Sequence, residues 1–144
     1  MSEPTTTHTL SDASLAHTGL RFILGVNIAL HGLTRLPQWT AFAEKITGLF
    51  SETPLPPDLV YATALVIPLA ETLIGVAMLI GVRLRLVLSA GLMLIGLLTF
   101  GTCLRQAWDA AGLQLVYGIA FWLLLSRRAD AALAWDGWRA SRAR

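Results

Sequence analysis

Four polar side chains interrupt long apolar segments, where polar groups are costly in a membrane and are candidates for function. Asn27, His31 and Arg35 are spaced four residues apart, so a helix would place them on one face. Glu71 lies in the middle of a second apolar segment. Pro68, one turn before it, has no backbone N–H and leaves a carbonyl oxygen to a water or a ligand. These groups could meet at similar depths in a bilayer.

A carboxylate and an imidazole at one site can pass on a proton, so Glu71 and His31 are the candidate catalytic residues. Arg35 could bind an anion, and Asn27 could bond to a polar headgroup. Between apolar walls, these groups would suit a quinone headgroup and its isoprenoid tail. Structural roles stay open: Glu71 could pair with His31 or Arg35 and hold two helices in register. Asn27 could bond to a neighbouring helix, and Arg35 could snorkel to the lipid headgroups.

A second group of polar residues lies further along the chain and could close the same cavity from its outer side. The candidate binding residues in this group are Arg105, Gln106, Gln114 and Tyr117. Gln114 and Tyr117 are three residues apart and would share a helix face. Capping of a loop, together with an aromatic belt at the membrane surface, is the alternative role for this group.

Long apolar segments must position these residues. Of the 144 residues, 55% are hydrophobic and 14% are charged, whereas about 25% are charged in an ordinary soluble domain. About 20 apolar residues in a helix cross a bilayer. The sequence therefore predicts an all-α integral membrane protein with spans at residues 20–36, 58–81, 86–104 and 113–125. The fourth span is short unless it starts earlier, near Ala107. Short connections favour an antiparallel four-helix bundle, with close contacts predicted at the small-residue pairs Gly25/Ala29 and Ala77/Gly81.

The segment 38–50 is too polar to span. Apolar side chains recur in it at helical spacing, while Glu44 and Lys45 lie on the other side. This pattern is typical of an amphipathic helix lying in the membrane interface, and we place it on the outer side between the first two spans. The chain then divides into a polar N-terminal tail, 1–17, a transmembrane domain, 18–126, and a basic C-terminal tail, 127–144.

The basic residues predict the orientation in the membrane. One side of the predicted bundle carries Arg21, Arg83, Arg85, Arg127, Arg128, Arg139, Arg142 and Arg144, and the other carries Arg35, Lys45 and Arg105. The side richer in Lys and Arg is cytoplasmic as a rule. We therefore expect both tails to be cytoplasmic, in a bacterial-type inner membrane. Arg21, near the inner end of the first span, could snorkel to the headgroups.

Several cofactors and partners are not expected. The single cysteine, Cys103, allows neither an internal disulfide nor a CxxC redox pair. A bis-histidine haem needs two facing imidazoles, but only His31 lies inside a predicted span and His17 lies at the opposite face. No Cys/His cluster suited to a metal is visible. The net charge of +2 comes from arginines at the ends of spans, which favours lipid headgroups over nucleic acid.

Three short motifs, in order over residues 18–126, resemble those of a known membrane-protein family. LRF at 20–22 with HGLTRL at 31–36 is similar to "R…HGxxKL", with Arg35 in place of the usual Lys. PLAE at 68–71, with later glycines and Arg83 or Arg85, is similar to "E…G…LGxxxR". FGTCLRQAW at 100–108, with Gln114 and Tyr117, is similar to "FGTxLRQxW…GxQxxY". Together they resemble the DoxX-like family (DoxX/DoxD), named for a small subunit of thiosulfate:quinone oxidoreductase.

The resemblance implies a four-helix membrane bundle that acts near the quinone pool. We therefore expect a membrane subunit of a redox system that binds quinone, or another lipid-soluble redox molecule, in its outer half. Glu71 and His31 would handle protons. Besides the bilayer and the quinone, a partner subunit or further copies of the chain are expected. The alternatives are a non-catalytic membrane scaffold that docks a partner and, less favoured, a transporter of a small molecule or ion.

Overall fold

The computed structural model describes residues 10–131 and 133–135 and is helical over this range, with no strand. Its elements are α1 (Asp12–Leu33), η1 (Leu36–Gln38), α2 (Trp39–Leu49), α3 (Pro57–Ile80), α4 (Leu84–Leu104), α5 (Trp108–Ser126) and η2 (Arg128–Asp130). Four helical segments are long and apolar enough to cross a membrane, and they contain α1, α3, α4 and α5. The prediction of an all-α chain with four candidate spans is confirmed.

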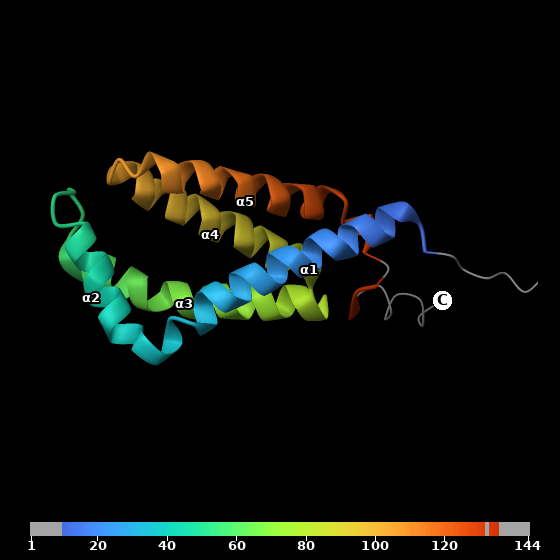
Figure 1. Ribbon diagram of the computed structural model, residues 1–144, viewed down its shortest axis with the longest axis horizontal. Coiled ribbons are helices and arrows are strands. Elements are labelled where there is room, and N and C mark those ends of the chain that lie inside the picture. The colour runs from blue at the N-terminus through green and yellow to red at the C-terminus, as the bar shows by residue number, and fades with distance from the viewer. Residues whose placement is uncertain (1–9, 132, 136–144) are drawn as a thin grey trace, which may run out of the picture.

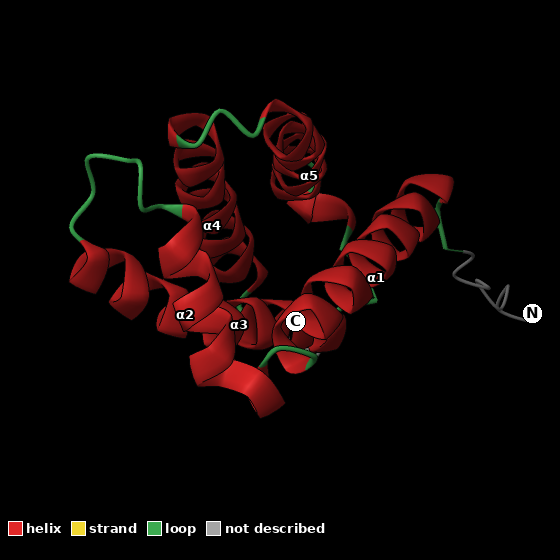
Figure 2. Ribbon diagram, turned by 60° about the vertical axis from the view of Figure 1, so that its left-hand side comes forward, coloured by secondary structure: helices red, strands yellow, loops and turns green. Residues whose placement is uncertain are grey.

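The long helices lie in two pairs. α1 packs mainly on α3, and α4 packs mainly on α5, while α2 packs on α3. Figure 2 shows α4 and α5 together on one side, with α1, α2 and α3 on the other. In Figure 1 the two pairs lie close together where α1 begins and α3 ends, and they separate toward α2. The candidate residues of the sequence lie in the half of the molecule where the pairs separate.

The hydrophobic core fills the other half. Its most buried large side chains come from all four long helices or their ends: Leu24, Met78, Leu84, Leu88, Phe121 and Leu124. Large apolar side chains also cover the outside, and the most exposed include Ile23, Leu73, Met93, Leu113, Val116 and Ile119. A soluble protein rarely exposes so much continuous apolar surface. This exterior is compatible with contact to a lipid bilayer.

Helix α1 begins eight residues before the predicted start of the first span. Ser11 caps it, since its hydroxyl oxygen accepts a hydrogen bond from the backbone N–H of Ser14 at 3.2 Å. The predicted tail, 1–17, therefore overlaps the helix. The added turns are held by tertiary contacts, because Ser14 and His17 are buried. Hydropathy along the chain carries no information about such contacts, so it could not predict this earlier start. Residues 1–9 lie outside the described part of the chain.

Glycines bring α1 and α3 into close contact. A Cβ atom on Gly75 would lie 2.3 Å from the backbone nitrogen of Ala29. A Cβ atom on Gly32 would lie 2.4 Å from the carbonyl oxygen of Pro68. Gly25 also faces this contact, with its Cβ position 3.3 Å from the carbonyl oxygen of Gly75. The small-residue pair predicted on the first span therefore lies where the two backbones meet.

Gly81, from the small-residue pair predicted on the second span, has a different role. Gly81 instead ends α3 in a left-handed conformation, with φ 79°, which glycine adopts without strain. A Cβ atom there would lie 2.7 Å from a guanidinium nitrogen of Arg21 and 2.7 Å from the Cβ of Ala134. Spacing alone does not distinguish a helix-contact glycine from a helix-ending one.

We expect Gly75→Val to destabilise the folded chain by about 1–3 kcal/mol, because its side chain must push α1 away from α3. The measurement is denaturant unfolding of the purified protein in detergent. Gly96→Val in α4 is the matched control, since a Cβ atom there meets nothing within 4 Å. Equal stability losses in the two variants would contradict the close contact.

Candidate functional site

An ion pair joins α3 to the segment that follows α1. Nη1 of Arg35 donates to Oε2 of Glu71 at 2.5 Å. The Glu71 side chain is 4% exposed, and that of Arg35 is 31% exposed. The guanidinium of Arg35 also lies over the ring of Phe42 in α2, 4.9 Å from its centre. Of the pairings that the sequence left open, Glu71 therefore adopts the one with Arg35 and not the one with His31.

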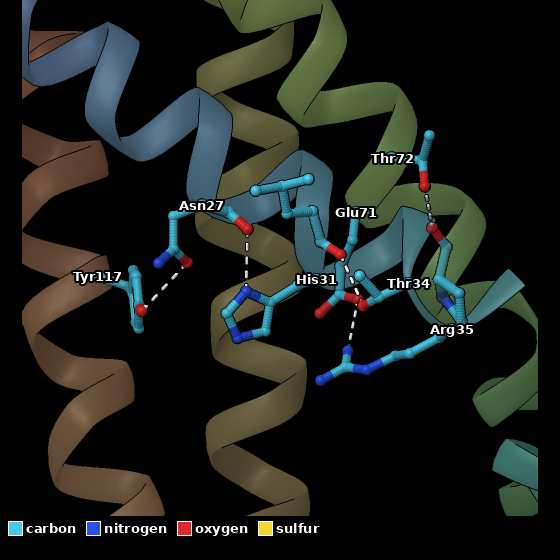
Figure 3. Close-up of polar contacts among 9 residues, drawn as sticks. Asn27, His31, Thr34, Arg35, Glu71, Thr72 and Tyr117 are labelled. Carbon is cyan, nitrogen blue, oxygen red and sulfur yellow. Dashed lines mark hydrogen bonds and ion pairs between the residues drawn. The ribbon is translucent and has the colours of Figure 1, made fainter.

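His31 lies beside this ion pair but bonds to its own helix (Figure 3). Its Nδ1 lies 2.9 Å from the backbone carbonyl oxygen of Asn27. Because a carbonyl oxygen only accepts, Nδ1 carries a proton and donates it. In the neutral ring Nε2 then keeps its lone pair. The imidazole is exposed, so this nitrogen can be reached by a ligand.

Tyr117 links the two groups of candidate residues. Its hydroxyl donates to Oδ1 of Asn27 at 3.2 Å, which joins α5 to α1 (Figure 3). Gln114, one turn earlier on α5, accepts a hydrogen bond from the Thr102 hydroxyl of α4 at 2.8 Å. The hydrogen bond from Tyr117 therefore connects α5 to the candidate residues on α1. Asn27 is engaged between helices, as one of its two predicted roles requires.

Arg105 and Gln106 lie in the turn between α4 and α5. Arg105 follows the last residue of α4, and its guanidinium lies 5.3 Å from the centre of the Phe50 ring. Gln106 is exposed and has a positive φ of 55°, which turns the chain toward α5. In the described part of the chain, no hydrogen bond or ion pair joins either side chain to Glu71, His31 or Asn27. In the structure, Arg105 packs against Phe50 and Gln106 turns the chain.

No protein-family model, curated protein or solved structure matches this chain. The DoxX-like resemblance of the motifs therefore stays a prediction, and function has to be argued from the geometry. Within residues 10–131 and 133–135, no group of three His, Cys, Asp or Glu side chains could hold a metal ion. The groups brought together are a carboxylate, a guanidinium, an imidazole, an amide and a phenol.

The opposite end of the molecule holds a buried arginine that the sequence assigned to the headgroups. Arg21 is 5% exposed. Its Nη1 donates to the carbonyl oxygens of Met78 at 2.6 Å and Leu79 at 3.2 Å, and its Nη2 donates to that of Leu133 at 2.9 Å. The last carbonyls of a helix lack helical partners and attract a cation. The expectation that Arg21 snorkels is wrong, because its side chain turns inward to the end of α3.

Two more polar residues of α1 fasten it to α5 and to η2. The Ser14 hydroxyl donates to the carbonyl oxygen of Asp130 at 2.8 Å. Nε2 of His17 lies 3.2 Å from the carbonyl oxygen of Leu124. Ala131 and Ala134 are buried in the core, so the described part of the predicted basic tail packs on the helices. The remainder of that tail, 136–144, lies outside the described residues.

Proposed function

We propose that this chain is a membrane subunit of a redox system that binds a quinone, or a similar lipid-soluble redox molecule, beside His31. The observation that carries the proposal is an exposed imidazole whose Nδ1 donates to a carbonyl oxygen, which leaves the lone pair of Nε2 for a ligand. In the neutral ring, Nε2 can accept the proton of a quinol hydroxyl. In the protonated ring, it can donate to a quinone carbonyl oxygen.

The neighbouring residues would complete the site. The carboxylate of Glu71 lies beside His31, and Arg35 holds it in place (Figure 3). The amide of Asn27, already bonded to Tyr117, could reach the second oxygen of the headgroup. Apolar helix faces would take the isoprenoid tail. The chain's own residues would bind and move protons, and a redox partner subunit would supply or accept the two electrons.

The test is quinone affinity, measured by quenching of tryptophan fluorescence in detergent, with mass spectrometry of quinone extracted from the gently purified protein. We expect co-purified quinone, and we expect His31→Gln to weaken its binding about tenfold, as the loss of one strong hydrogen bond does. His31 makes no bond to another helix among the described residues, so the variant should fold.

Thr34→Val is the matched control. Thr34 is also exposed, and its hydroxyl donates to a carbonyl oxygen of its own helix, that of Leu30, at 2.8 Å. Its replacement should leave quinone affinity unchanged. Absence of bound quinone, or the same affinity in the His31 and Thr34 variants, would contradict the proposed site.

A non-catalytic scaffold is the second candidate, and the Glu71–Arg35 ion pair favours it. A buried carboxylate that fastens α3 to the end of α1 is what a purely structural pair would look like. In this case the ion pair would fix the positions of the helices that form a docking surface for a partner protein. Replacement of Glu71 would then weaken folding or assembly and spare any activity of the assembled complex.

We further propose that the four long helices form an antiparallel bundle in a bacterial-type inner membrane, with both chain ends cytoplasmic and α2 in the outer interface. The start of α1 and the end of α5 lie at the same end of the molecule (Figure 1). Arginines gather there, and the Lys/Arg-rich side is cytoplasmic as a rule.

Membrane-impermeant thiol labelling of intact cells should modify a Lys45→Cys variant and spare an Arg127→Cys variant, both built on Cys103→Ser. The reverse pattern would invert this orientation.

A further inference from the structure

An open cavity of about 460 Å³ lies at the arginine-rich end of the molecule, away from His31 and Glu71. It is lined by Arg83, Arg85, Leu86, Ser89 and Arg128. The first four belong to the turn before α4 and to the first two turns of that helix, and Arg128 begins η2. Three arginines from two separate parts of the chain therefore line one space.

The charge of this cavity suits an anion. Among the described residues that line it, none is acidic. Guanidinium groups bind phosphate oxygens through paired hydrogen bonds, and the Ser89 hydroxyl can donate one more. The start of α4 adds the positive end of its helix dipole. A phosphate group would meet complementary charge from α4 and from η2 together.

The surface next to the cavity is apolar, which favours a lipid over a free ion. Leu86 lines the cavity and is 62% exposed. From it an exposed stripe runs along α4 at helical spacing: Leu86, Ala90, Met93, Leu97 and Phe100. Residues spaced in this way share one helix face. An acyl chain could follow this stripe while its headgroup stays at the arginines.

We propose that this cavity binds the phosphate of an anionic phospholipid headgroup, with the acyl chains lying along the exposed face of α4. The headgroup would join the α3–α4 turn to the segment after α5. The site is separate from the proposed quinone site and does not depend on it.

The experiment is native mass spectrometry of the full chain from detergent micelles that hold equal amounts of phosphatidylglycerol and phosphatidylcholine with the same acyl chains. The wild-type protein should retain phosphatidylglycerol in preference. Arg128→Gln should lower that preference about fivefold, as expected for one arginine at a lipid surface, and Arg85→Gln should do the same. Arg85 and Arg128 are exposed, so their variants should keep the wild-type unfolding midpoint.

Arg127→Gln is the matched control, because Arg127 is the exposed neighbour of Arg128 and does not line the cavity. It should retain the wild-type preference. An equal loss in the Arg127 and Arg128 variants, or no preference in the wild type, would overturn the proposal.

Inorganic phosphate is added in a parallel sample to separate the two sources of phosphate. If it displaces the bound lipid and itself binds only when Arg128 is present, the cavity is a free-phosphate site and the lipid assignment fails.

Discussion

Replacing Arg21 by glutamine should destabilise the folded chain by about 3–5 kcal/mol, because two charged N–H groups each lose hydrogen bonds of about 1.5–3 kcal/mol to buried carbonyl oxygens. One guanidinium group serves the end of α3, through Met78 and Leu79, and the segment after α5, through Leu133. Glutamine is too short to reach both. The carbonyl oxygens left without a donor would remain buried, which adds to the cost.

The measurement is unfolding of the purified variant by a denaturing detergent, compared with Arg127→Gln as an exposed arginine of the same end. The stability of Arg21→Lys should fall between those of the wild type and Arg21→Gln. A lysine ammonium group keeps the charge, but it lacks the two terminal N–H groups of a planar guanidinium that reach separate acceptors. A loss below about 1 kcal/mol for Arg21→Gln, the usual range for a surface change, would show that this arginine is not the connection described.

The second large effect is expected at Glu71. Glu71→Ala should destabilise the protein by about 3 kcal/mol, because it leaves the half-buried guanidinium of Arg35 without its partner. Arg35 is 31% exposed, so water can solvate part of the orphaned charge and keep the loss at the lower end of the range for buried pairs. Glu71→Gln should cost less, because an amide oxygen can still accept from Arg35.

A double-mutant cycle isolates the charge–charge part of this interaction. Glu71→Gln, Arg35→Gln and the double variant should give a coupling free energy of about 1–3 kcal/mol, as contacting charged residues do. The double variant should recover part of the stability that either single variant loses. Additive losses would mean that the two side chains act independently, contrary to their contact in the structure.

The double variant also separates the two candidate functions. With the ion pair replaced by a neutral pair, a scaffold should assemble with its partner and leave the activity of the complex intact. In the quinone-binding subunit that we propose, the complex should assemble but lose proton-coupled turnover, because no carboxylate remains beside His31.

The helices follow from the sequence because hydropathy is a local property. The second span, predicted at 58–81, corresponds to α3 (Pro57–Ile80), and the third, predicted at 86–104, corresponds to α4 (Leu84–Leu104). The fourth was predicted at 113–125, or with an earlier start near Ala107, and α5 (Trp108–Ser126) has the earlier start. Asp109 and neighbouring small residues lower the hydropathy of its first turn. The early start of α1 depends on contacts with the end of α5 that no local pattern contains.

The candidate site was only partly predictable. Spacing placed Asn27, His31 and Arg35 near one another, and the helical period is enough for that. Which of them meets Glu71 depends on how α1 is rotated against α3, and the bond from Tyr117 depends on where α5 lies. Arg21 was predicted to reach the headgroups because it lies near the end of an apolar segment. That position in the sequence is the same whether the side chain turns outward to the headgroups or inward to the protein.

The central claim, a lipid-soluble redox ligand beside His31, is tested most directly by photolabelling with an azido-quinone, followed by peptide mapping. We predict that the label attaches to the last turns of α1, around Asn27 and His31, and to α5 near Tyr117, and that unlabelled quinone suppresses it. Label found only away from Asn27, His31 and Tyr117, at an intensity that unlabelled quinone does not change, would contradict the claim.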